Sequence, residues 1–244
     1  MSPNLIGALL MMASMACFTF NDALIKMTDG ALPLFQLLFL RGILASLLIF
    51  LMARARGALR GPVAPMDRMM IAVRSLSEVG AAYFFISALL NMPLANVTAI
   101  LQILPLTVTL GSALFFREAV GWRRMLAIVI GFAGMLMIVR PGSDGFSLWS
   151  VYALIAVLCV TVRDLSTRRL SGDVPSLLVT LSASVTVLVA SGLASLTTEW
   201  APVTPTLAWL LGGSSVFIVG GISSRCRSCG PGMCRLLHHS DTPV

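Results

Sequence analysis

Three ionisable side chains lie inside long apolar stretches of the sequence, where an isolated charge is costly. Asp22 lies near the end of the first stretch, Arg41 in the middle of the second, and Glu78 near the start of the third. Charged residues surrounded by hydrocarbon usually face a cavity or a partner charge, and they often mark substrate sites or proton relays. Arg41 could bind an anionic group such as a carboxylate, and protonation of Glu78 could change the charge of the same site. We therefore name Asp22, Arg41 and Glu78 as candidate substrate or coupling residues.

Each of these residues also has a structural interpretation, which the sequence leaves open. Asp22 and Lys26 are four residues apart, the spacing of an ion pair on a helix surface, and both could anchor the end of a helix at an interface. Glu78 could be neutralised by Arg41, or by Arg74 one turn before it. An ion pair that only holds the bundle together is the alternative to substrate contact.

Neutral polar residues extend the candidate site. Tyr83 and Gln102 could line a cavity, and hydrogen bonds between helices, worth about 0.6 kcal/mol on average in membranes, are their alternative role. Pro105 lies inside the fourth apolar stretch and has no backbone N–H, so we expect it to kink or break that helix. A broken helix frees a carbonyl that a cavity could use.

The elements that must position these residues are membrane-spanning helices. The chain of 244 residues is 57% hydrophobic and 11% charged, with a mean hydropathy of +0.94. Soluble domains are about 25% charged, and a spanning helix needs roughly 20 mainly apolar residues. The expected fold is therefore an all-α integral membrane protein with about eight transmembrane helices, the first of them uncleaved. We expect these helices at residues 5–24, 33–52, 76–90, 95–116, 125–139, 148–162, 175–196 and 206–221.

Basic residues are distributed unequally between alternate loops. The loops after the first, third, fifth and seventh helices contain only Lys26 and Arg140. Because Lys and Arg favour cytoplasmic loops, we expect a multi-pass protein of the inner membrane with a cytoplasmic amino terminus. The basic residues expected in the other loops are Arg54, Arg56, Arg60, Arg68, Arg74, Arg117, Arg123, Arg124, Arg163, Arg168 and Arg169.

Several function classes are disfavoured by the sequence. The net charge is +7, but the basic residues lie between the apolar stretches rather than along one face of a helix, so we expect no nucleic-acid partner. No expected helix contains histidine, and the chain has no H-E-x-x-H, Walker or G-x-G-x-x-G motif. We therefore expect no enzyme, no cofactor and no metal site. The expected partners are membrane lipid and a small-molecule metabolite, and a homodimer stays open.

An internal repeat relates two parts of the chain. An acidic residue, a basic residue, a glycine and a proline recur with the same spacing at an offset of 142 residues: Asp22, Lys26, Gly30 and Pro33, then Asp164, Arg168, Gly172 and Pro175. Because this offset crosses five expected helices, an odd number, the second copy must be inverted in the membrane.

The order of several motifs over about residues 5–221 resembles the drug/metabolite transporter superfamily, in particular its EamA-type units. The resemblance implies a ten-helix carrier, made of two inverted five-helix repeats, that moves small organic metabolites across the inner membrane by alternating access. This chain would hold one complete repeat and part of a second. The alternatives are an inactive truncated fragment and a half-carrier that requires a partner chain. The residues that carry the resemblance are Arg41, Ala95 to Leu106, Arg117-Glu118, Gly121 to Arg124, Gly131 to Gly134, Ile138 to Gly142 and Arg163 to Leu165.

The chain thus divides into residues 1–142, the first repeat, residues 147–221, the incomplete second repeat, and residues 222–244, a tail of different composition. Codons permitted for the tail can be read one base earlier as a hydrophobic segment similar to residues 83–106, which favours a frameshift. A disordered cytoplasmic tail and a zinc site are the alternatives, the latter because Cys226 and Cys229 have structural-zinc spacing. The further possible ligands are Cys234, His238 and His239.

Overall fold

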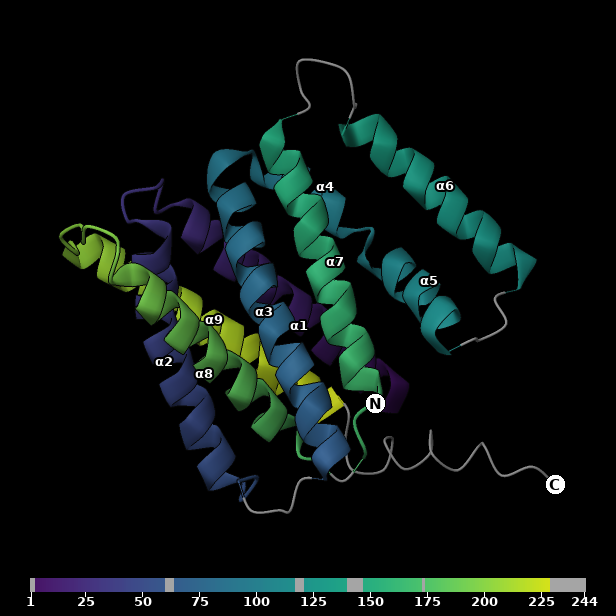
Figure 1. Cartoon of the computed structure of the whole chain (residues 1–244), viewed down its shortest axis with the longest axis horizontal. Helices are drawn as coiled ribbons and strands as arrows, with labels where there is room; N and C mark the ends of the chain where they lie inside the picture. The colour runs from purple at the N-terminus through teal and green to yellow at the C-terminus, as the bar shows by residue number, and fades with distance from the viewer. Residues whose placement is uncertain (1–2, 60–63, 117–120, 140–146, 173, 229–244) are drawn as a thin grey trace.

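The computed structural model describes residues 3–59, 64–116, 121–139, 147–172 and 174–228, and these form a bundle of helices (Figure 1). No strand occurs within these ranges. The tail beyond Ser228, with Cys229, Cys234 and both histidines, lies outside the described residues. The helices are α1 Pro3–Lys26, α2 Leu34–Ala55, α3 Pro65–Asn91, α4 Leu94–Leu101, α5 Leu104–Phe116, α6 Trp122–Val139, α7 Leu148–Arg168, α8 Ser176–Ser195 and α9 Pro205–Ser228.

The expected all-α membrane fold is confirmed. Seven stretches of the described chain are long and apolar enough to cross a membrane, and one of them consists of α4 and α5 together. The helix α6 occupies the place of the fifth expected helix. Each of the eight expected helices therefore has a counterpart, and the fourth is divided in two.

The expected start of the third helix was wrong. The helix α3 begins at Pro65 rather than at Leu76, so Arg68 and Arg74 belong to a helix and not to a loop. Pro65 at the first helical position and Asp67 in the first turn are both favourable helix starts, because proline needs no donor there and a carboxylate stabilises the helix dipole. The expected boundary was set by hydropathy, which the charged first turns of α3 reduce.

Short turns reverse the chain at both ends of the bundle. After α1, Asp29 and Gly30 both adopt positive φ angles, of 47° and 71°, so the glycine supplies a conformation that other side chains rarely accept. Proline precedes the next helix, since Pro33 is the N-cap of α2. The turn after α7 ends in the same way, with Pro175 as the N-cap of α8.

Three pairs of helices, each far apart in sequence, form the centre of the bundle: α1 with α9, α2 with α8, and α3 with α7. The segments α4 and α5 then pack on α7 (Figure 1). Small residues allow these close approaches. A Cβ atom added at Gly80 of α3 would lie 3.1 Å from the Cys159 sulfur of α7, and one added at Gly220 of α9 would lie 3.7 Å from the Cys17 sulfur of α1.

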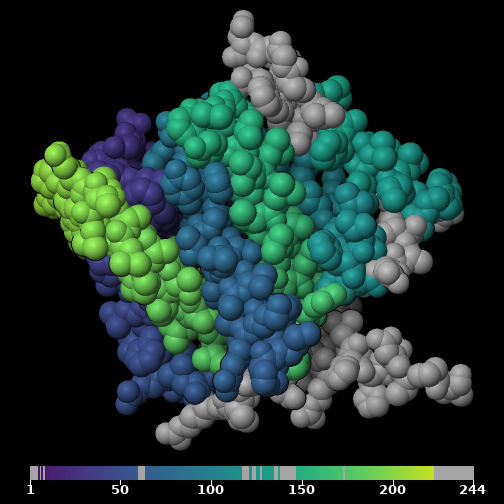
Figure 2. Space-filling view, viewed as in Figure 1, coloured from purple at the N-terminus to yellow at the C-terminus, as the bar shows by residue number. Residues whose placement is uncertain are grey.

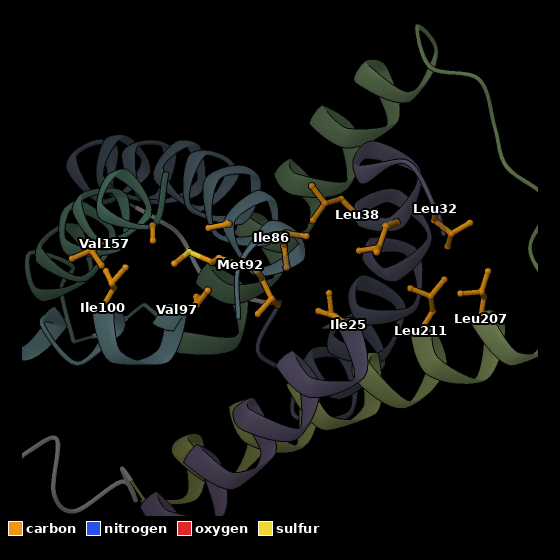
Figure 3. Packing of buried hydrophobic residues seen from close by; sticks show 14 of the residues in the cluster. Ile25, Leu32, Leu38, Ile86, Met92, Val97, Ile100, Val157, Leu207 and Leu211 are labelled. Atoms are coloured by element: carbon orange, nitrogen blue, oxygen red, sulfur yellow. The ribbon is translucent and has the colours of Figure 1, made fainter. Parts of the chain in front are cut away.

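The buried apolar core gathers at one end of the bundle, where α1 and α3 end and where α2, α4 and α9 begin (Figure 3). Ile25, Leu37 and Leu89 are at most 1% exposed there. At this end Gln36 is fully buried, and its amide both accepts from the Ala201 N–H at 2.9 Å and donates to the Ala201 carbonyl at 2.8 Å. This end of the bundle is therefore closed by apolar packing and by a two-point link between α2 and the segment before α9.

Helix ends recur at the offset of the sequence repeat. The helix α1 ends at Lys26 and α7 ends at Arg168, and α2 begins at Leu34 while α8 begins at Ser176. Both pairs of positions are 142 residues apart, the same offset as the sequence motif. The motif therefore lies at two turns whose flanking helices end and begin at matching positions.

Candidate functional site

Arg41 of α2 lies near acidic residues of two other helices. The charges of Asp22 on α1 and of Glu78 on α3 both act on its guanidinium, and all three side chains are partly buried. Within the described residues Arg41 forms no ion pair, because no carboxylate approaches it within 4.0 Å. A partly buried guanidinium with free donors is a good receptor for a carboxylate or a phosphate.

Asp22 has a neighbour that sequence analysis did not include in the site. The Asn21 amide donates to the Asp22 carboxylate at 2.9 Å, and Asn21 is only 3% exposed. The other atom of that amide, Oδ1, is buried and has no hydrogen-bond partner among the described atoms. A buried acceptor without a partner costs about 1–3 kcal/mol, so this position could accept a hydrogen bond from a bound molecule.

Lys26 does not pair with Asp22, although their spacing allowed it. Its ammonium instead donates to the Leu90 carbonyl at the end of α3, at 2.9 Å. Lysine near a helix C-terminus commonly satisfies such a carbonyl. Asp22 therefore interacts with the Asn21 amide and with the charge of Arg41 rather than with Lys26.

Glu78 pairs with a residue from the distant part of the chain. Arg163 of α7 lies 3.5 Å from the Glu78 carboxylate and 2.9 Å from Asp164. The sequence suggested that Arg74 or Arg41 could neutralise Glu78. The charge of Glu78 acts on both of them, but the ion pair itself forms with Arg163, which the sequence did not suggest. The available signal was the Arg163-Asp164 pair itself, placed at the repeat positions of Asn21 and Asp22.

Arg74 has structural partners in the same region. Its Nε donates to the Thr167 hydroxyl at 3.0 Å, and its terminal nitrogen donates to the Val179 carbonyl at 3.3 Å. These bonds connect α3 with α7 and with α8. Arg74 thus connects three helices, whereas the Arg41 side chain forms no hydrogen bond to another described residue.

Tyr83 lies in an aromatic cluster and not beside the charged residues. Its ring stacks on Phe35 at a centroid distance of 5.8 Å and tilts toward Tyr152 at 6.4 Å. Phe84 and Trp149 complete the cluster through edge contacts. These rings come from the start of α2, the second half of α3 and the start of α7, so they lie toward the closed end of the bundle.

The expected break at Pro105 is confirmed. The helix α4 ends at Leu101 and α5 begins at Leu104, and proline at position 105 cannot donate to the Leu101 carbonyl. Gln102 lies at this break as the C-cap of α4, and both Gln102 and Pro105 are exposed. The candidate residues thus occupy three regions: the charged group, the aromatic cluster and the helix break.

No group of three or more metal-ligating side chains occurs within the described residues. Cys17 and Cys159 are free thiols in helix interfaces. What the structure does combine is a bundle of apolar helices, a broken helix and partly buried charges of both signs, features that recur in membrane transport proteins.

The chain belongs to the EamA-like transporter family, which matches residues 5–140. It is 33% identical over 183 residues to the pseudopaline exporter of Pseudomonas aeruginosa, a match that covers 68% of this chain and 60% of the exporter. It is 32% identical over 105 residues to the riboflavin transporter of Vibrio cholerae, covering 43% of this chain and 35% of that protein. The chain thus spans about 60% of the length of the exporter.

A solved crystal structure shares the fold. It aligns with 100% of this chain and with 90% of its own, at a TM-score of 0.60 and 20% sequence identity. That likeness concerns the arrangement of helices alone.

Proposed function

We propose that this protein is an inner-membrane secondary carrier for a small ionised organic metabolite. The observation that carries the proposal is Arg41, a partly buried cation that forms no ion pair with any described residue and that feels the charges of Asp22 and Glu78. A guanidinium in this setting favours an anionic group on the substrate, and the two carboxylates suit a cationic or hydrogen-bond-donating group beside it. The names of the relatives include both an exporter and riboflavin transporters, so direction is a matter for experiment.

Alternating access between two inverted repeats is the proposed mechanism, with residues 1–142 as the first repeat and 147–221 as part of the second. The pairing of helices supports it. If α1, α2 and α3 are equivalent to α7, α8 and α9, then the α1–α9 contact is equivalent to the α7–α3 contact, and the α2–α8 contact is equivalent to itself. A two-fold axis would then pass between α2 and α8, and movement about it would open the ends of the bundle in turn.

The proposed orientation places the amino terminus in the cytoplasm. The closed end, with its apolar core, would then face outward, and the end with Arg163 and Arg74 would face inward. Epitope tags inserted after Gly57 and after Asn91 should be accessible from opposite sides of the membrane in intact cells. Accessibility of both tags from the same side would contradict the orientation.

Transport by the purified chain tests the function. Proteoliposomes that contain the wild type should take up, or exchange, at least one member of a panel of ionised metabolites, and neutral solutes should not compete. Arg41→Gln should lose this activity, whereas Arg54→Gln, at the end of the same helix, should retain it. Equal transport by Arg41→Gln and the wild type would refute the role of Arg41.

A half-carrier that needs a partner chain is the second candidate, and unequal coverage of two equivalent helix faces favours it. On α7, Val157 and Thr161 are 1% and 7% exposed, and the Thr161 hydroxyl lies 2.8 Å from that of Thr107 on α5. At the offset of 142, the equivalent residues of α1 are Met15, which is 46% exposed, and Thr19, which is also exposed. A helix supplied by a second chain could cover this face of α1.

The two candidates differ in the species that transports. Cysteine cross-linking across the Met15 face and the mass of the active species in detergent distinguish them. A monomer that transports at full rate supports the carrier and excludes the half-carrier, and activity found only in a cross-linkable dimer supports the half-carrier. A chain that transports in neither form is an inactive fragment.

A further inference from the structure

A groove of about 200 Å³ opens between α3, α5 and α7, apart from the charged group described above. Met70 and Val73 form its wall in the first turns of α3, and Phe115 and Phe116 form another at the end of α5. The third wall is one face of α7. In Figure 1 these parts of the three helices lie at the same end of the bundle, and Figure 2 shows the adjoining surface of α3 and α7 from the same direction.

The face of α7 in the groove is apolar except at its end. Val162, Leu165, Ser166 and Arg169 follow the spacing i, i+3, i+4 and i+7, which places them on one side of the helix. Leu165 is buried at the bottom, whereas Val162 and Phe115 are 42% and 64% exposed at the rim. The groove is therefore an apolar channel that opens sideways from the bundle, toward the surrounding hydrocarbon.

Arg169 is the charged residue among those that line the groove. It is the C-cap of α7, and its guanidinium lies over the Phe116 ring at 5.1 Å from the centroid. This cation–π contact fixes the charge at the mouth of the groove. A guanidinium carries five donors, so hydrogen-bonding capacity remains for a ligand when one face lies on a ring.

We propose that the groove binds an anionic phospholipid, with one acyl chain against Val73, Val162 and Phe115 and the phosphate on Arg169. Three features favour a lipid over other occupants. The walls are apolar along their length, the cation lies at the helix ends where a headgroup would be, and the groove opens laterally rather than into the bundle. Basic residues between transmembrane helices at this level commonly select acidic headgroups. The lipid would hold α5 against α7 and α3 at a place where α5 has few other neighbours.

Arg168 provides a matched control, because it is the adjacent arginine of α7, is also exposed, and does not line the groove. The purified protein would be titrated with phosphatidylglycerol and with phosphatidylcholine, and bound lipid would be counted by native mass spectrometry. We expect the wild type to bind phosphatidylglycerol preferentially. Arg169→Gln should weaken that binding about fivefold, and Arg168→Gln should leave it within twofold.

A second variant tests the acyl chain separately from the headgroup. Val73→Trp should fill the groove and reduce the binding of phosphatidylglycerol while Arg169 stays in place. Equal binding of the two lipids, or equal loss in Arg168→Gln and Arg169→Gln, would overturn the proposal. Displacement of bound lipid by a transported solute, or loss of binding only when the protein dimerises, would also overturn it, because the groove would then belong to the substrate or to a second copy of the chain.

Discussion

Replacement of Glu78 by glutamine separates a transport role from a structural one. The substitution removes the charge that faces Arg163 and Arg41 and keeps the size of the side chain. If Glu78 acts on substrate or on a coupled proton, transport should fall by about tenfold to a hundredfold, the effect of losing one charged hydrogen bond of about 1.5–3 kcal/mol. The pH dependence of the remaining transport should become flatter, because the variant has no carboxyl group to titrate at this position.

The structure predicts a much smaller effect on folding. The Glu78–Arg163 distance is 3.5 Å, and the two side chains are 30% and 24% exposed. Partly solvated pairs of this kind contribute about 0–1 kcal/mol. Arg163 also keeps its closer partner Asp164 at 2.9 Å. The free energy of unfolding should therefore fall by about 1 kcal/mol or less, which is below a tenfold change in the unfolding equilibrium.

The assay compares uptake in proteoliposomes with reversible unfolding in mixed micelles, for the wild type, Glu78→Gln and the control Glu199→Gln. Glu199 is an exposed carboxylate in the segment between α8 and α9, so its loss should change neither measurement. Wild-type transport with an unchanged pH profile in Glu78→Gln would refute the proposed role. A loss of transport that only follows the loss of folded protein would show that Glu78 is a structural residue.

Three further predictions concern the helices that hold the site. Gly80→Leu should destabilise the protein by about 2 kcal/mol, because the Cys159 sulfur lies 3.1 Å from the first added carbon. Gly212→Leu should be neutral or stabilising, because no atom of another segment lies within 4 Å of that carbon. Reversible unfolding of the two variants measures the difference. Gln36→Leu should lower the melting temperature in detergent through a loss of about 2 kcal/mol, because both backbone groups of Ala201 lose their partner, and an unchanged melting temperature would contradict this link. Pro105→Ala should allow α4 and α5 to join, and amide exchange at residues 102–104 should slow. Exchange as fast as in the wild type would show that proline does not cause the break.

The helices could be predicted from the sequence because apolar length alone decides which segments enter a bilayer. The same criterion missed the first turns of α3, where Asp67, Arg68 and Arg74 reduce the hydropathy. Pro65 was the local signal that hydropathy did not use. The break before Pro105 could be predicted because it follows from covalent structure rather than from packing.

The composition of the site could be predicted only in part. Charges within apolar segments identified Asp22, Arg41 and Glu78 without any knowledge of the fold. The partner of Glu78 could not be predicted, since Arg163 is 85 residues away and the contact depends on how α3 packs against α7. The surroundings of Tyr83 depend in the same way on α2 and α7, and the exposure of Gln102 depends on which side of the break faces outward.

The break between α4 and α5 leaves a polar backbone group inside the membrane. The helix α4 has only eight residues, about 12 Å of rise, so neither segment crosses the hydrocarbon alone and the chain must turn irregularly within it. Hydrocarbon offers nothing to the Leu101 carbonyl, which lacks its usual amide donor, so water or a neighbouring polar group must reach that depth. Water at that depth would open a path for protons through the membrane, and the buried apolar core around Ile25, Leu37 and Leu89 is where such a path would be blocked.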